Sequence, residues 1–164
     1  MPGQGTRIDF VTGAPEKYAN LVDAMSVLPG RYRAALANAS DATIRREPSA
    51  TDWSAYRNLA HVLFVTEANE VFIRQMATMS EPTRKSFPVG IIAEELETLS
   101  VPELSARLGA AIGRTVDLLG HTPDAAWGRP GYVRGLRRSL RQMVVGNTAH
   151  ILEHLDNITK LVAP

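Results

Sequence analysis

The chain has 164 residues, with 18 Lys or Arg against 17 Asp or Glu, which leaves a formal net charge of +1 at pH 7. We expect one domain over residues 1–164, long enough to bury about two-thirds of the surface that its unfolded chain exposes. The near balance of charge argues against a strongly basic nucleic-acid binder. Because the sequence contains no cysteine, disulfides, thiolate metal ligands and a thiol nucleophile supplied by the protein are excluded.

The same sequence indicates a cytoplasmic location without membrane attachment. No apolar run approaches the ~20 residues that span a bilayer. Met1 to Val11 contain no apolar core and little positive charge, so a secretory signal is not expected.

The first half of the chain predicts two long helices. Apolar residues at helical spacing indicate the first over residues 15–38, with a kink or a split at Pro29-Gly30. Residues 41–51 are polar and contain a proline, which predicts a crossover loop. The second helix is expected from about residue 54 to residue 79.

The second half predicts two more. Residues 83–99 are mixed in character, with a short helix expected over 91–99. Ser100 and Glu103 form the pattern of a capping box, which begins a third helix that continues to about residue 119. Residues 122–136 hold two prolines and three glycines and predict a long irregular connection. A second capping box, Ser139 with Gln142, begins a fourth helix that ends near residue 162.

Four amphipathic helices with almost no strand-like alternation imply an all-α fold, a four-helix bundle. The connections between the first and second helices, and between the third and fourth, are long enough for crossovers.

Three of the four histidines lie on the inner faces of these helices. His150 and His154 are one turn apart, so their Cβ atoms lie about 5–6 Å apart on one face, close enough for both rings to bind one cation. They share a strip with Asn147 and Asn157 at the edge of the core face. His61 lies on a mostly apolar line of the second helix.

Each histidine has a simpler interpretation when taken alone. His61 fits a core residue satisfied by one hydrogen bond, and His150 with His154 fits a partly exposed pair. Three buried imidazoles without partners would cost about 1–3 kcal/mol each, whereas one cation satisfies all three. Composition and geometry give the metal site and the simpler interpretation nearly equal weight.

Other residues near these histidines have two interpretations each. His121 is either a fourth ligand or, as we favour, an exposed ring at a helix C-terminus. Trp53 either lines a cavity or, as we favour, anchors the start of the second helix. Asn147 and Asn157 are candidates to hydrogen-bond the imidazole N–H groups from a second layer around the metal. Glu153 is expected to be solvated.

A basic cluster precedes and begins the fourth helix. Its members either belong to a solvated loop with Asp or Glu partners, or form an anion site for a carboxylated or phosphorylated ligand near the cavity. Arg137 and Arg141 are the candidates for anion binding. A DNA surface is the weakest interpretation, because the chain is nearly neutral. The cluster consists of Arg129, Arg134, Arg137, Arg138 and Arg141.

Two motifs resemble those of the DinB/YfiT-like metalloproteins, a family of four-helix bundles. Asp52-Trp53-Ser54 followed by Asn58-Leu59-Ala60-His61-Val62 resembles the start of that family's second helix. The run from Asn147 to Ile158 is similar to its H-x-x-x-H helix. Both motifs stand at the expected places, so the resemblance covers nearly all of the chain.

The resemblance implies that His61, His150 and His154 are metal ligands, with water in an open coordination position. Imidazole ligands suit zinc, nickel, iron or copper rather than calcium or magnesium. It further implies a metal-dependent enzyme with a small-molecule substrate. Such an enzyme would transfer a low-molecular-weight thiol, of the mycothiol or bacillithiol type, to an electrophile, isomerise a thiol adduct, or act as a hydrolase. The alternative is a non-catalytic metal- or ligand-binding module of a stress response. We also expect a homodimer.

Overall fold

The computed structural model describes residues 16–164. The expectations for residues 1–11 and for a helix start at Pro15 lie outside this range. The elements are α2 (Glu16–Ser26), α3 (Leu28–Leu36), α4 (Asp41–Arg45), α5 (Ala55–Thr78), α6 (Glu94–Glu97), α7 (Val101–Gly120), α8 (Asp124–Trp127), β1 (Pro130–Val133), β2 (Leu136–Ser139) and α9 (Leu140–Val162).

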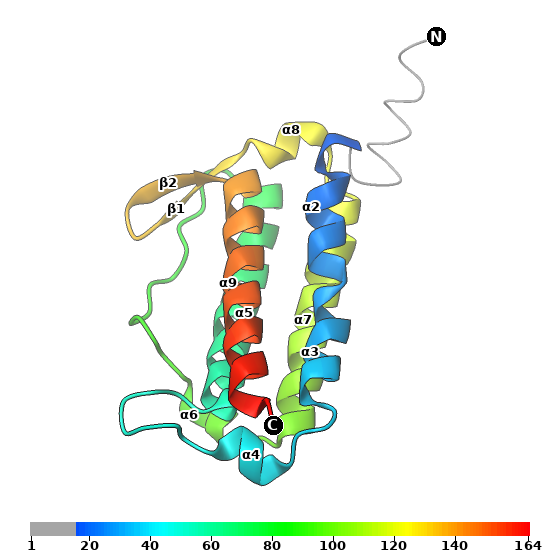
Figure 1. The fold of residues 1–164 in the computed structure, drawn as a ribbon. Helices are drawn as coiled ribbons and strands as arrows, with labels where there is room; N and C mark the ends of the chain where they lie inside the picture. Colours follow the sequence, from blue (N-terminus) through cyan, green and yellow to red (C-terminus); the bar gives the residue numbers. More distant parts are fainter. Residues whose placement is uncertain (1–15) are drawn as a thin grey trace.

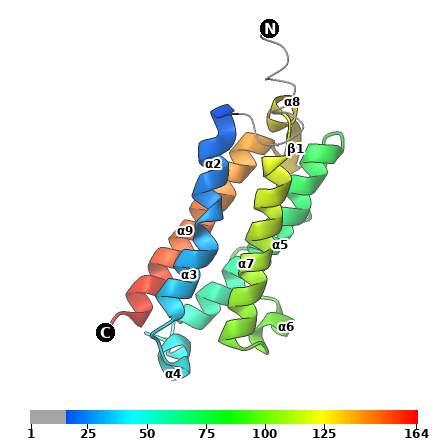
Figure 2. The ribbon, with the colours of Figure 1, turned by 90° about the vertical axis from the view of Figure 1, so that its right-hand side faces the viewer.

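The long helices form a four-helix bundle, as the sequence predicts (Figures 1 and 2). One column is α2 followed by α3, and the other three are α5, α7 and α9. The first column packs on α7 and α9, and α5 packs on the same two helices. The first column and α5 therefore lie at opposite corners, as do α7 and α9. The chain passes between opposite corners twice, from α3 to α5 and from α7 to α9. Both passages are long connections, and they are the predicted crossovers.

The first helix is split rather than continuous. The break falls at Val27, two residues before the predicted site, and Pro29 lies in the first turn of α3. A proline is tolerated there because the first N–H groups of a helix have no partner within it. The prediction of a split is confirmed, and its position is corrected.

Both predicted connections contain more regular structure than expected. Residues 41–51 include the short helix α4, whose N-cap Ser40 accepts a hydrogen bond from the Thr43 N–H at 3.1 Å. Residues 122–136 are not irregular throughout, because they contain α8, β1 and the start of β2. The antiparallel strands β1 and β2 turn at Arg134 and Gly135, with φ of 52° and 78°. Two consecutive positive φ values are what a tight two-residue hairpin turn requires.

The predicted capping boxes both form. Ser100 caps α7 with Glu103, and Ser139 caps α9 with Gln142. In each box the side chain of the third helical residue returns a bond to the backbone of the cap, so the starts of these helices are fixed locally. The short helix α6 occupies the middle of the predicted segment 91–99.

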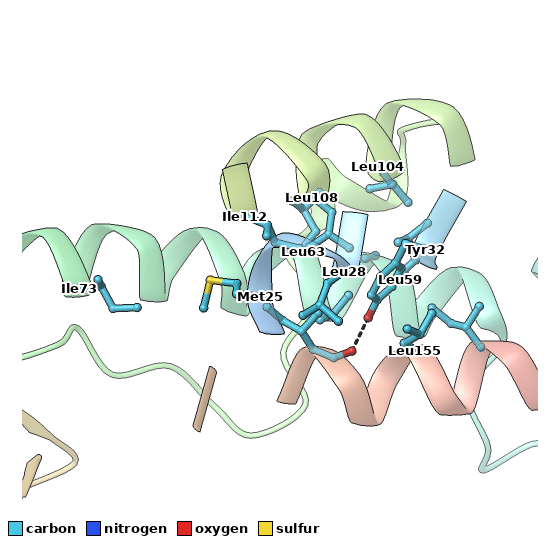
Figure 3. Packing of buried hydrophobic residues seen from close by; sticks show 14 of the residues in the cluster. Met25, Leu28, Tyr32, Leu59, Leu63, Ile73, Leu104, Leu108, Ile112 and Leu155 are labelled. Atoms are coloured by element: carbon cyan, nitrogen blue, oxygen red, sulfur yellow. Dashed lines mark hydrogen bonds between the residues drawn. The ribbon is translucent and has the colours of Figure 1, made fainter. Parts of the chain in front are cut away.

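The core runs between all four columns. Figure 3 shows residues such as Leu28, Leu63, Leu108 and Leu155 meeting from different helices. Tyr32 crosses this core, and its hydroxyl donates to the backbone carbonyl of Ile151 at 2.6 Å. That bond fixes α9 to α3 next to His150. Within residues 16–164, no helix is long and apolar enough to cross a membrane.

Candidate metal centre

Three histidines converge from two antiparallel helices. His61 lies on α5, and His150 and His154 lie on the middle turns of α9. One ring nitrogen from each lies within 4.8 Å of the other two. His61 and His154 are buried, and His150 is partly buried. The structure therefore brings together the three residues that the sequence analysis singled out as metal ligands.

The protonated nitrogen of His61 is fixed by its neighbour. Its Nδ1 lies 2.7 Å from the backbone carbonyl of Ile91. A carbonyl can only accept, so Nδ1 must carry the proton. The neutral ring therefore presents an unprotonated Nε2, which is the form that binds a metal.

His154 is fixed in the same way through two steps. The side-chain amide of Asn58 donates to the Ser54 carbonyl at 2.9 Å, which identifies its other atom as the oxygen. That oxygen lies 2.8 Å from Nδ1 of His154 and must accept its proton. The Nε2 atom of His154 is consequently free of a proton as well.

The third ring completes a set that suits a cation. Nε2 of His150 lies 3.2 Å from Nε2 of His154. Two nitrogens bound about 2.1 Å from one tetrahedral ion lie about 3.4 Å apart, so this spacing fits a shared metal. The Nδ1 atom of His150 is buried without a protein partner among the described residues.

Burial favours the uncharged forms of His150 and His154. Burial, followed by the proximity of His61, lowers the pKa of His150 below its ordinary value. Burial, followed by His150 and His61, lowers the pKa of His154 to about 3. Metal ligation requires neutral imidazole, so the site is prepared for a cation at neutral pH.

Trp53 lies against this cluster. Its ring centroid is 5.0 Å from that of His61 and 6.3 Å from that of His154. The contact favours a site-lining role over the anchor that the sequence analysis preferred. Gly90 lies against the indole of Trp53 and has a φ of +72°. A Cβ added at Gly90 would lie 3.4 Å from the indole ring.

The remaining candidates lie elsewhere. His121 is exposed, and its Nδ1 bonds the Asp117 carbonyl at 2.8 Å, which matches the favoured interpretation. Glu153 is exposed, as expected. Among the described residues, no hydrogen bond joins Asn147 or Asn157 to an imidazole. Asn147 instead accepts from Asn69 at 3.0 Å, and Asn157 lines a cavity beside His154.

Sequence reasoning missed the residue that does hold an imidazole. Asn58 precedes His61 by three residues and lies within the motif that carried the family resemblance. Its position one helical turn from a predicted ligand was the available signal.

A cavity of about 590 Å³ rises from the histidines along α5 and α9. His61 and His150 line one part of it, and Arg141 lines another. Arg137, which the sequence analysis proposed for anion binding, does not line this cavity, whereas its neighbour Arg138 does. Both lie on β2, and successive residues of a strand point to opposite sides. The walls are made by His61, Val65, Asn69, Arg84, Phe87, Pro88, Val89, Gly90, Arg134, Arg138, Arg141, Gln142, Met143, Val145, Gly146, Asn147 and His150.

Comparison with known proteins agrees with this architecture. Residues 24–158, which include all three histidines, match the DinB superfamily. The chain belongs to this superfamily. YfiT from Bacillus subtilis, described as "a probable metal-dependent hydrolase with an unusual four-helix bundle topology", has a similar solved structure. The TM-score is 0.81 at 16% sequence identity, over 90% of this chain and 87% of YfiT. A comparison with curated protein sequences found no significant match. The DinB/YfiT resemblance and the predicted four-helix bundle are thus confirmed.

Proposed function

We propose that this DinB-superfamily protein is a divalent-metal-dependent enzyme that transfers a low-molecular-weight thiol to an electrophile or isomerises a thiol adduct. The proposal rests on one observation. Three imidazoles converge beside a cavity, and two of them are held by neighbours with Nε2 unprotonated. Zinc, nickel and iron all suit such nitrogen ligands.

The protein residues have separate roles in this proposal. His61, His150 and His154 hold the ion, and the Ile91 carbonyl and Asn58 keep two of the rings in the required orientation. When bound, the ion supplies a Lewis acid that favours the deprotonated form of a thiol or a water molecule. The cavity walls hold both reactants close together, which raises the rate by positioning.

The thiol must come from outside the chain, because the chain contains no cysteine. A cavity of about 590 Å³ has room for a small thiol and a small electrophile. Hydrolysis is the second candidate, favoured by the likeness to YfiT. It would use the same three ligands, with water in place of the thiol.

Metal content is the first test. Purified, untagged protein should carry close to one divalent transition ion per chain by elemental analysis. The His61→Ala and His150→Ala variants should lose it, since two imidazoles bind such ions far more weakly than three. The matched control is His121→Ala, which removes an exposed histidine outside the cluster and should leave the metal content unchanged. Equal content in all four proteins would contradict the site.

Turnover separates the remaining possibilities. Metal-loaded protein is mixed with mycothiol, bacillithiol or glutathione together with epoxide, quinone or halide electrophiles, and separately with ester and amide substrates. Thiol-dependent turnover that is lost in His61→Ala supports the transferase. Ester or amide cleavage without added thiol, lost in the same variant, selects the hydrolase. Metal binding with equal rates in the wild type and the variant leaves the non-catalytic binding module.

A further inference from the structure

A hydrogen-bonded relay on the cavity wall leaves one buried donor free. Arg84 donates from Nη1 to the side-chain oxygen of Asn69 at 2.7 Å. Because a guanidinium can only donate, the other amide atom of Asn69 is nitrogen, and it donates to the oxygen of Asn147 at 3.0 Å. The remaining amide nitrogen of Asn147 is therefore the free atom. It is buried without a protein partner among the described residues, on a side chain that is only 2% exposed.

Arg84 has a free edge of its own. Its Nε is buried and also lacks a protein partner within residues 16–164. Since Nη1 is taken by Asn69, the Nε and Nη2 edge remains, and this edge binds a carboxylate with two parallel hydrogen bonds. The guanidinium is held in place over the ring of Phe87, 4.7 Å from its centroid. Its backbone N–H is also fixed, by a bond to the carbonyl of Tyr132 at 2.9 Å.

The surroundings carry an excess of positive charge. Arg134, Arg138 and Arg141 line the same cavity as Arg84, and no Asp or Glu is among its described lining residues. In residues 16–164 no carboxylate lies within 4.0 Å of these four guanidinium groups. Burial, followed by the charge of Arg134, lowers the pKa of Arg84. A bound anion would relieve both effects.

This donor set adjoins the histidines. Asn147 precedes His150 by three residues, a rise of about 4.5 Å along the helix, and both line the cavity. A molecule held by Arg84 and Asn147 would therefore extend its other end toward the three imidazoles.

We propose that Arg84 and Asn147 bind a carboxylate group of the substrate or of the thiol, with Arg134, Arg138 and Arg141 attracting it to the cavity. The planar, two-point edge of Arg84 fits a carboxylate, and the free amide nitrogen of Asn147 is a further donor on the wall of the same cavity. The apolar wall of Val65, Phe87 and Met143 fits a short carbon chain. This inference rests on the proposed function only in treating the bound anion as a reactant.

The test measures binding of succinate by calorimetry, with protein from which metal has been removed by a chelator that is then dialysed away. Wild-type protein should bind it, because the anion contacts lie outside the metal ligands. Arg84→Gln and Asn147→Asp should each weaken binding by about tenfold or more. Asn147→Asp is informative because its carboxylate still accepts from Asn69, yet replaces the free N–H with a repelling oxygen. Thermal unfolding near that of the wild type would show that this variant folds.

The matched control is Arg33→Gln. It removes the same charge from α3, where Arg33 lines a different cavity, and should bind succinate as the wild type does. The proposal is overturned if the wild type does not bind succinate, if Arg84→Gln and Asn147→Asp bind it unchanged, or if inorganic phosphate binds more tightly than succinate. Succinate binding by a protein that carries no metal and has no turnover would reject the proposed function while supporting this site.

Discussion

In the candidate metal centre, one hydrogen bond to His61 and one to His154 decide which nitrogen of each of these two rings is free. Asn58 is central, because it links the start of α5 to His154 on α9. Because its amide is held by the Ser54 carbonyl, Asn58 in turn fixes the orientation of the His154 ring on the other helix. A ring without such a partner can turn or take the other tautomer, and both changes weaken metal binding.

Replacing Asn58 by Ala should weaken metal affinity by about 10–100-fold while leaving the three ligands in place. The physical reason is that Nδ1 of His154 loses its acceptor and the ring loses its orientation. Affinity is measured by competition with a chelating dye, and circular dichroism checks the fold. Asn157→Ala is the matched control, since Asn157 lines the neighbouring cavity and forms no hydrogen bond to an imidazole within residues 16–164. A similar loss of affinity in both variants would contradict the role of Asn58.

The clustering of the three histidines was predictable from the sequence, but the groups that hold their rings were only partly so. Because His150 and His154 are four residues apart, the sequence predicts that they share one face of a helix. The acceptor for His61 is the backbone carbonyl of Ile91. Every residue has a backbone carbonyl, so the residue types in the sequence do not show which one accepts this bond. Arg84 lies in the long connection between α5 and α7, where helical periodicity carries no information about what it contacts.

At the scale of elements, the hairpin β1–β2 decides which arginines reach the cavity. Tyr132 on β1 forms an isolated parallel bridge with Thr83, and its backbone also bonds residues Pro82 and Arg84. The hairpin thereby fixes the segment that carries Arg84. The sequence analysis missed it because β2 is mostly exposed and rich in arginine, with no apolar alternation.

Gly131 is the point where the hairpin meets α5, and Gly131→Ala should destabilise the fold by about 1–3 kcal/mol through overpacking. A Cβ there would lie 2.7 Å from Phe72 and 3.0 Å from Met76. Denaturant unfolding measures the change in the free energy of unfolding.

Gly113→Ala is the matched control for this substitution. Gly113 lies inside α7, and apart from its chain neighbours and the backbone of its own helix no described heavy atom lies within 4 Å of the added Cβ. Alanine there should stabilise the protein by about 0.5–1 kcal/mol. The reverse order, with Gly131→Ala the more stable variant, would show that β1 does not pack closely on α5.

At the scale of the whole molecule, the crossovers create the site. They make α5 and α9 neighbours although these helices are second and last among the four columns. The sequence predicted four helices and long connections, because helical periodicity and capping boxes are local signals. The order of the helices around the bundle depends on packing between distant segments such as Tyr32 and Ile151, and local patterns do not record it.

The outer face of α5 motivates the prediction of a homodimer. Phe64, Ala68 and Val71 lie along one stripe of the helix and line a cavity of about 490 Å³. Val71 is 57% exposed. The inner faces of α5 already pack on α7 and α9, and the ring of Phe87 covers Phe64, with 5.2 Å between the ring centroids. Val71 is the exposed part of this stripe and is left for a second copy. A two-fold pair that placed two such stripes together would cover them both, and two-fold pairs are the commonest soluble oligomers.

Sedimentation velocity at micromolar concentration should therefore give twice the 17.9 kDa mass of one chain. Val71→Lys should shift the mass to that of one chain, because two buried ammonium groups would face each other across the axis. Val27→Lys is the matched control. Val27 is 55% exposed but lies between α2 and α3, and this variant should remain a dimer. A wild-type mass of 17.9 kDa would reject the dimer, and a dimeric Val71→Lys variant would reject this face of α5 as its interface.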